Sequence, residues 1–137
     1  MARKAQGRRM TTHVADASAI LAMLGREPGH ERVAAVLSSA VMSAVNLAEV
    51  VSSLINKGIP AADARDTAES LEIETVPLDD RLALDTGALR EATSARGLSL
   101  GDRACLALAR SLGVPALTAD RAWAELGLDV EVRLIRE

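Results

Sequence analysis

The sequence predicts an α/β domain with a parallel, doubly wound sheet, for two reasons. Short apolar or β-branched segments alternate with segments whose hydrophobic residues recur at helical spacing, and pairs of helices fill several connections. The chain also lacks Phe and Tyr and has one Trp, so Ala, Val, Leu and Ile must fill its core, which suits α/β or all-α packing. Its 137 residues are enough for one domain with one hydrophobic core.

The first half of the chain contains two predicted strands, each followed by two helices. The first strand is a short apolar run, and the helical stripe after it continues until Gly25 and Pro28 interrupt it. Gly58 suits the C-terminus of the third helix, and Pro60 suits the first turn of the fourth. The expected elements are a strand at 13–15, helices at 17–24 and 30–39, a strand at 40–45, and helices at 46–58 and 60–72.

The second half contains three predicted strands separated by helices. A segment that alternates β-branched and polar residues predicts the first of these strands. A long helical pattern follows, then a strongly apolar helix that ends at Gly113. The expected elements are a strand at 73–78, helices at 79–97 and 99–113, a strand at 114–119, a short helix at 121–126 and a final strand at 129–135.

Charge divides the chain into a basic leader and a more acidic body. The formal net charge is −3, but the leader contains Arg3, Lys4, Arg8 and Arg9 and no acid. We therefore expect residues 1–9 to be a disordered basic leader and residues 10–137 to form the domain. The single cysteine excludes an internal disulfide, and the absence of a long apolar stretch or signal-peptide pattern predicts a cytoplasmic location and no membrane partner.

Four acidic residues stand where carboxylates can gather. Asp16 and Asp120 each follow a predicted strand, and ligands of open parallel sheets bind beyond the carboxyl ends of the strands. Glu49 borders an apolar helix face, and Asp102 lies in the first turn of an apolar helix. Each also has a structural explanation: Asp16 and Asp120 as helix caps, Asp102 in a capping box with Ser99, and Glu49 as an exposed helix residue.

Carboxylates that meet at one sheet edge repel one another, and a divalent cation relieves that repulsion. Mg²⁺ and Mn²⁺ prefer hard oxygen ligands and keep some of their waters, which suits an open carboxylate site. Such a site acts on phosphates, because the metal polarises a phosphoryl oxygen and lowers the pKa of the attacking water. His13 and His30 have no partner histidine at helical spacing, so zinc is not expected. Cys105 is expected to lie in the core, and Trp123 is expected to pack under the last turn.

With these residues in place, the chain resembles the PIN-domain ribonucleases, and most of all the VapC toxins of type II toxin–antitoxin systems. The resemblance extends from about Met10 to the C-terminus. Its specificity comes from four segments in a fixed order, which are "VADASAIL", "SAVNLAEVV", "LSLGDRACLALA" and "PALTADRAWAEL". The resemblance implies a PIN-like single domain with a central, mostly parallel sheet of about five strands flanked by helices.

The same resemblance implies a metal-dependent endoribonuclease with Mg²⁺, or Mn²⁺, as its cofactor. Asp16, Asp102 and Asp120 would hold the metal directly or through water, and Glu49 would help to hold it or orient the attacking water as a base. Water would then attack an RNA phosphodiester in line and leave 5′-phosphate and 3′-hydroxyl ends.

Further residues acquire roles from the same comparison. Thr118 corresponds to a hydroxyl residue that positions a water or supports the last acid, and Ser18 and Asn46 correspond to polar positions that flank the site. Arg103 and Arg121, basic residues next to Asp102 and Asp120 in the sequence, are candidates for holding the RNA backbone. A solvated helix face explains both arginines equally well.

A toxin resemblance also implies partners, namely a cognate antitoxin, an RNA substrate and a second copy of the chain in a homodimer. The nearest alternative is a PIN-domain nuclease of RNA processing without a toxin role. A phosphorylated receiver domain also places acids at strand ends, but it needs a lysine at the carboxyl end of a late strand. The only lysines here are Lys4 and Lys57, which disfavours a receiver domain.

Overall fold

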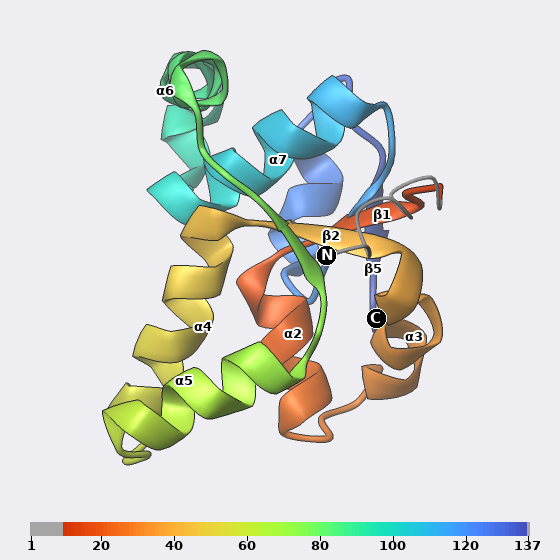
Figure 1. Cartoon of the computed structure of the whole chain (residues 1–137). Helices are drawn as coiled ribbons and strands as arrows, with labels where there is room; N and C mark the ends of the chain where they lie inside the picture. Colours follow the sequence, from red (N-terminus) through yellow and green to blue (C-terminus); the bar gives the residue numbers. More distant parts are fainter. Residues whose placement is uncertain (1–9, 137) are drawn as a thin grey trace.

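Five short parallel strands form the central sheet of the computed structural model, which describes residues 10–136 (Figure 1). The expected leader at residues 1–9 lies outside the described residues. The spatial order of the strands is β3-β2-β1-β4-β5, which confirms the predicted parallel, doubly wound α/β fold. The strands are β1 (His13–Ala15), β2 (Ala40–Ser43), β3 (Glu74–Val76), β4 (Ala116–Thr118) and β5 (Val132–Leu134).

The strand order reverses between β1 and β4, and this reversal positions the site. From β1 the chain builds outward through β2 to β3, and it then crosses the sheet to add β4 on the other side of β1. Ala15 pairs with Leu117, and the Asp16 amide donates to the Leu117 carbonyl at 3.0 Å. Asp16 and Thr118 therefore leave adjacent strands at the same edge, where open α/β sheets bind their ligands.

Helices cover both faces of the sheet, as Figure 1 shows with α6 and α7 above the strands and α2, α3 and α5 below them. Among the described residues, no helix is long and apolar enough to cross a membrane. The helices are α2 (Ala17–Leu24), α3 (His30–Val36), η2 (Leu37–Ser39), α4 (Ala44–Asn56), α5 (Ala61–Ser70), α6 (Asp80–Thr93), η3 (Ser94–Arg96), α7 (Leu100–Leu112) and η4 (Arg121–Glu125).

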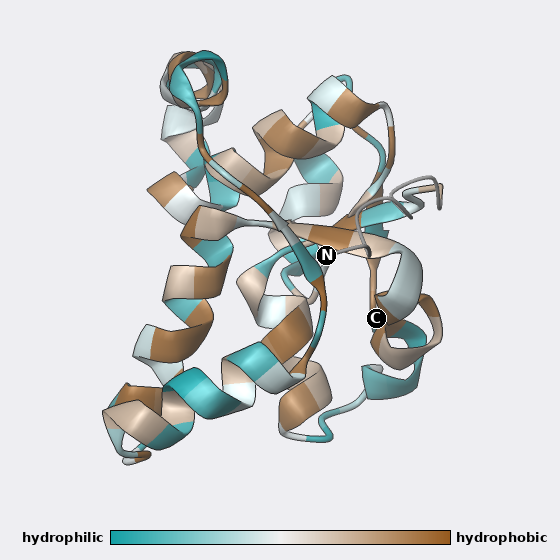
Figure 2. Cartoon of the chain, in the orientation of Figure 1, coloured by the Kyte–Doolittle hydropathy of each residue, from teal (hydrophilic) through white to brown (hydrophobic). Residues whose placement is uncertain are grey.

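Strand alternation divides the core into two clusters. Ala15, Met42 and Leu117 pack with α2, α3, α4 and α5, whereas their strand neighbours face α6, α7 and η4 on the other side. Figure 2 shows hydrophobic colouring on β2 in the centre of the molecule and hydrophilic turns on the outer helix α5. The three central strands β1, β2 and β4 are almost wholly buried, as expected for a parallel sheet that helices cover on both sides, whereas the edge strands β3 and β5 are partly exposed.

The main difference from the expected elements is at the β2–α4 junction. The predicted strand continued to residue 45, but the Ser43 side chain accepts a hydrogen bond from the Val45 amide at 3.2 Å and caps a helix that begins at Ala44. A serine at a strand end therefore acts as a helix N-cap, which shortens the strand and lengthens the helix.

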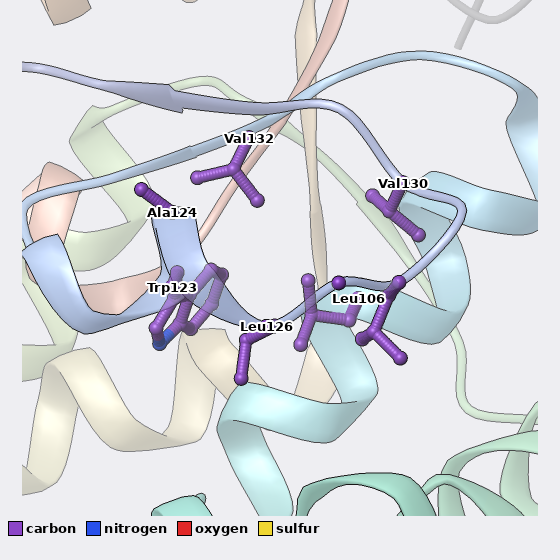
Figure 3. A pocket seen from close by; sticks show the side chains of 8 residues that line it. Leu106, Trp123, Ala124, Leu126, Val130 and Val132 are labelled. Atoms are coloured by element: carbon purple, nitrogen blue, oxygen red, sulfur yellow. The ribbon is translucent and has the colours of Figure 1, made fainter.

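Trp123 is buried, as expected, and lines a cavity of about 200 Å³ between η4, α7 and the last strand (Figure 3). Leu106 of α7 and Val132 of β5 form other parts of its wall. Cys105 is fully buried on the same side of the sheet, which confirms that it is a core residue.

The two residues that follow β5 also hold the connection between α2 and α3. The Arg136 guanidinium donates to the Pro28 carbonyl at 2.9 Å and lies 3.5 Å from the Glu27 carboxylate. Gly29 has φ 94° and lies so close to the Ile135 backbone that a Cβ atom there would overlap the Ile135 carbonyl. Only glycine fits this contact without strain, because it combines a left-handed backbone with no side chain.

Gly87 is the reverse case, because nothing at its position requires glycine. It lies in the middle of α6 on an exposed face, and an added Cβ would meet no atom within 4 Å. Gly87→Ala should raise the free energy of unfolding by about 0.5–1 kcal/mol, because alanine loses less backbone entropy in a helix. Chemical denaturation measures the change, and a loss of stability would show that another part of the protein covers this face of α6.

Candidate active site

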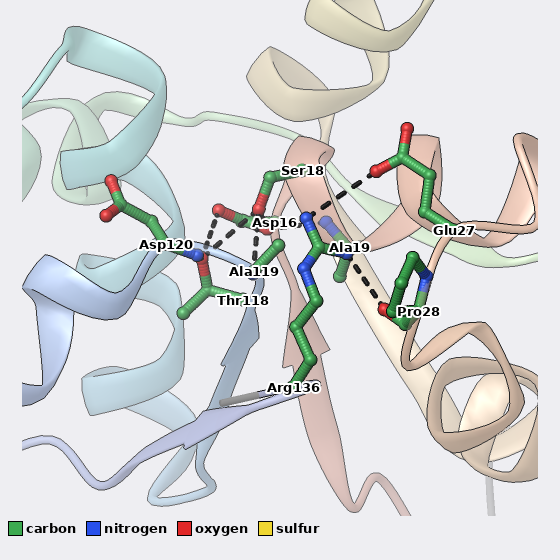
Figure 4. A network of polar contacts seen from close by, with 9 residues as sticks. All are labelled: Asp16, Ser18, Ala19, Glu27, Pro28, Thr118, Ala119, Asp120 and Arg136. Carbon is green, nitrogen blue, oxygen red and sulfur yellow. Dashed lines mark hydrogen bonds and ion pairs between the residues drawn. The ribbon is translucent and has the colours of Figure 1, made fainter.

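Asp16 is the centre of a buried polar cluster at the switch point, which is the place between β1 and β4 where the strand order reverses (Figure 4). It ends β1 and caps α2, where its Oδ1 accepts from the Ala19 amide at 2.9 Å. The Ser18 hydroxyl donates to Oδ1 at 2.7 Å, and the Thr118 hydroxyl donates to Oδ2 at 2.8 Å. Asp16 is only 3% exposed. The same buried carboxylate therefore caps a helix and lies at the predicted site, so the two interpretations of this residue do not exclude each other.

Burial decides the protonation behaviour of Asp16. Desolvation raises the pKa of its carboxyl group from 3.8 to about 6, and the negative charge of Asp102 adds to the rise. The hydrogen bonds from Ala19, Ser18 and Thr118 lower the pKa, but they do not offset the desolvation. A carboxylate in this position is therefore ionised near neutral pH at a cost to stability.

Two hydroxyl groups connect Asp16 to the strand on the other side of the switch point. The Thr118 hydroxyl accepts from the Asp120 amide at 3.0 Å, and the Ser18 hydroxyl accepts from the Ala119 amide at 2.9 Å. Each hydroxyl has one proton. When both protons are donated to Asp16, none is left for a hydrogen bond between the Ser18 and Thr118 oxygens, which lie 3.2 Å apart. Thr118 and Ser18 thus hold both carboxylate oxygens and the turn that leads to Asp120.

A second polar group joins α4 to the start of α7. The Asn46 side chain is 1% exposed, and its Nδ2 donates to Glu49 Oε1 at 2.9 Å and to the Gly101 carbonyl at 3.1 Å. Glu49 itself is half-buried. It is therefore neither a fully exposed helix residue nor a core residue, and its carboxylate lies against α7.

Asp102 is both a helix cap and a neighbour of the other acids. It forms a capping box with Ser99, with its carboxylate accepting from the Ser99 amide at 3.0 Å. Burial raises the pKa of the Cys105 thiol, and the negative charges of Asp16, Asp102 and Glu49 raise it further. These three acids therefore lie within electrostatic range of the same buried thiol on α7.

Asp120 and the hydroxyl cluster share a turn, but the Asp120 carboxylate is exposed. Its Oδ1 accepts from the Ala122 amide at 3.0 Å and caps η4. Across residues 10–136, no three Asp, Glu, His or Cys side chains stand together closely enough to form a ready-made metal centre. Asp16, Asp102 and Glu49 thus act on one buried thiol, Asp120 is connected to Asp16 through Thr118, and the four acids do not close around a single point.

The two candidate RNA-binding arginines differ in their surroundings. Arg121 is exposed on η4. Arg103 is 8% exposed, its Nη1 donates to the Thr86 carbonyl of α6 at 3.2 Å, and its Nε has no partner among the described residues. A solvated helix face was therefore the wrong expectation for Arg103, and a guanidinium buried between α6 and α7 cannot hold an RNA backbone in this conformation.

A profile of the PIN-domain family matches residues 14–128, which is most of the chain and includes all four acids. The chain belongs to the PIN-domain family. The resemblance inferred from the four sequence segments is therefore confirmed at the level of the family. No curated protein sequence matches the chain significantly.

Solved structures with the same fold cover nearly the whole PIN domain. The DNA-bound VapBC complex of Salmonella typhimurium has a chain 18% identical to this one, with a TM-score of 0.72, over 92% of this chain and 99% of that chain. A toxin–antitoxin complex from Klebsiella pneumoniae gives 16% identity and a TM-score of 0.73, with 92% and 99% coverage. VapC20 of Mycobacterium tuberculosis, described as a Sarcin-Ricin loop cleaving toxin, gives 22% identity and a TM-score of 0.71, over 89% of this chain and 99% of that chain.

The raised pKa of Asp16 predicts how the stability of this PIN domain depends on pH. A pKa raised on folding, from 3.8 to about 6, means that stability from this group is complete below the unfolded pKa and is lost as pH rises through the folded pKa. Asp16→Asn removes the ionisable group, and with it the loss of stability at high pH, while a side chain of nearly the same size still fills the buried position. The advantage of Asp16→Asn over the wild type in metal-free buffer should therefore be about 2 kcal/mol larger near pH 7.5 than near pH 4.5.

Chemical denaturation of both proteins at the two pH values measures the difference. Asp79→Asn is the matched control, because Asp79 also caps a helix, through the Leu82 amide at 2.9 Å, but is exposed. A stability difference between Asp16→Asn and wild type that is the same at both pH values would contradict the buried, ionised carboxylate.

Proposed function

We propose that this PIN domain is a metal-dependent endoribonuclease and the toxin of a type II toxin–antitoxin pair. One observation carries the nuclease proposal: Asp16 is buried at the switch point with its carboxylate oxygens held by Ser18 and Thr118, while the charges of Glu49 and Asp102 lie nearby. Buried like charges are unfavourable unless a cation balances them. Membership of the PIN family supports the same activity.

The side chains suit a hard divalent cation such as Mg²⁺ or Mn²⁺. The available ligands are carboxylate oxygens, and the buried Oδ1 of Asn46 is an acceptor with no partner among the described residues. Asp16 and Asp102 would hold the ion, with Glu49 and Asp120 contributing through water, because the four acids do not close around one point. When bound, the ion supplies charge neutralisation and a water of lowered pKa.

The protein's own part in the reaction is to position the carboxylates and to orient the attacking water. Thr118 and Ser18 keep the Asp16 carboxylate in one rotamer, so that its free lone pairs point in a fixed direction. Glu49, half-buried beside Asp102, is suited to help hold the ion or to orient the attacking water as a base. Water then attacks the phosphodiester in line, the ribose 3′-oxygen leaves, and the products carry 5′-phosphate and 3′-hydroxyl ends.

The toxin assignment draws on the structural relatives. Several proteins of this fold were solved as VapBC or other toxin–antitoxin complexes, and one is described as cleaving the Sarcin-Ricin loop. At this low sequence identity the relatives support the fold alone, and the partner is our inference from them. The proposed partner is a cognate antitoxin that covers the acidic edge. A cytoplasmic location and a homodimer are further parts of the proposal. RNA processing without a toxin role is the competing function.

Substitution of single acids tests the nuclease proposal. Asp16→Asn and Asp102→Asn should reduce RNA cleavage with Mg²⁺ or Mn²⁺ by at least about a hundredfold, because each removes a charge that balances the ion. Asp120→Asn should also reduce cleavage while its cap survives, since an asparagine oxygen can still accept from the Ala122 amide. Asp79→Asn, at an exposed cap of α6 that shares no hydrogen bond with the cluster among the described residues, should leave cleavage unchanged. Full activity in a folded Asp16→Asn protein would overturn the assignment.

Expression in a bacterial host separates the toxin from the processing nuclease. Wild-type chain should arrest growth, Asp16→Asn should not, and co-expression of the neighbouring gene should restore growth if that gene encodes the antitoxin. Harmless expression of an active nuclease would favour RNA processing instead. Sequencing of RNA 5′ ends after brief induction identifies the cleavage sites.

A further inference from the structure

Glu49 is the one acid of the cluster that approaches from α4, so its carboxylate must reach across to α7. Its neighbours Asp16 and Asp102 are held by helix caps of their own, whereas no backbone amide within residues 10–136 donates to the Glu49 carboxylate. A glutamate side chain has three rotatable bonds, and a half-buried one loses several rotamers when it is held in place. Its position in the cluster therefore needs a specific explanation.

Asn46 supplies one part of that explanation. It lies one turn before Glu49 on α4, and its buried Nδ2 donates to both Glu49 Oε1 and the Gly101 carbonyl. One amide thus holds the glutamate and attaches it to the first turn of α7. The other atom of the same amide, Oδ1, is buried and has no partner among residues 10–136, so the Asn46 side chain is not explained by packing alone.

Gly101 supplies the other part. It is buried in the first turn of α7, next to Asp102, and a Cβ atom at this position would overlap all three atoms of the Glu49 carboxylate group. The carboxylate therefore occupies the space that every other residue type would fill at position 101. Helix propensity disfavours glycine here, which leaves the carboxylate as the physical reason for it.

We propose that Asn46 and Gly101 form a seat for the Glu49 carboxylate and act as positioning residues of the site. Gly101 provides the space, and Asn46 holds the carboxylate in it, so that Glu49 and Asp102 face the same ion or water from two helices. This inference rests on the proposed nuclease function for its catalytic consequence. The seat itself exists in the protein without metal and can be tested there.

Gly101→Ala is the decisive variant. The displaced atoms are the end of a flexible side chain, so Glu49 should rotate out and the protein should stay folded. Loss of an outer partner of a metal ligand typically lowers metal affinity ten- to a hundredfold, and we expect a loss in this range for Mn²⁺ measured by calorimetry. Gly87→Ala, also in a helix but with open space at its Cβ position, is the matched control and should bind Mn²⁺ like the wild type.

A second background distinguishes a seat for Glu49 from a general role of Gly101. In Glu49→Ala protein the carboxylate is gone, so adding Gly101→Ala should cause no further loss of Mn²⁺ affinity. A further tenfold loss in the double variant would overturn the proposal, because it would show that Gly101 acts independently of Glu49.

A metal-free measurement keeps the seat separate from the proposed function. The side-chain amide of Asn46 gives its own ¹H–¹⁵N signals, and the bond to a carboxylate shifts them. In Gly101→Ala these signals should move to the positions found in Glu49→Ala, while in Gly87→Ala they should stay. Unmoved signals in Gly101→Ala would overturn the seat. Moved signals in a protein whose wild type neither binds Mn²⁺ nor cuts RNA would support the seat and reject the nuclease.

Discussion

The pairing of β1 with β4 is the constraint on which the site depends. Asp16 and Thr118 are 102 residues apart in the chain, yet they leave adjacent parallel strands at the same edge and share a hydrogen bond of 2.8 Å. This pairing exists because the chain crosses the sheet through α6 and α7 and adds β4 beside β1 instead of beside β3. The reversal of strand order leaves room above the edge, and the two hydroxyl groups then hold the carboxylate there.

That arrangement places stability and function in opposition. A carboxylate that is 3% exposed and receives three hydrogen bonds still has a raised pKa, so the protein without metal carries an unfavourable charge in its interior. Asp102 and Glu49 increase the negative potential from α7 and α4. Binding a cation would relieve this cost, which means that the affinity of the site for an ion and the instability of the empty site have the same electrostatic origin.

The contact between α4 and α7 is the second element of the site. It explains why Gly101 belongs to the site while Arg103, on the same helix, does not. Asn46 and Gly101 join the two helices under Glu49. Arg103, only two positions after Gly101, turns instead toward α6 and donates to the Thr86 carbonyl. Neighbours along one helix thus serve different faces, because successive residues point about 100° apart around its axis.

The fold class and the succession of strands and helices along the chain, to within a few residues, could be predicted from the sequence, because hydrophobic periodicity and helix caps are local properties. Four short segments in a fixed order were enough to indicate the family and the acids Asp16, Glu49, Asp102 and Asp120. The burial of Asp16, the exposure of Asp120, the enclosed position of Arg103 and the space that Gly101 leaves for Glu49 could be found only in the folded protein. Those outcomes depend on which helix faces which, and packing between elements distant in sequence leaves no periodic signal in the chain.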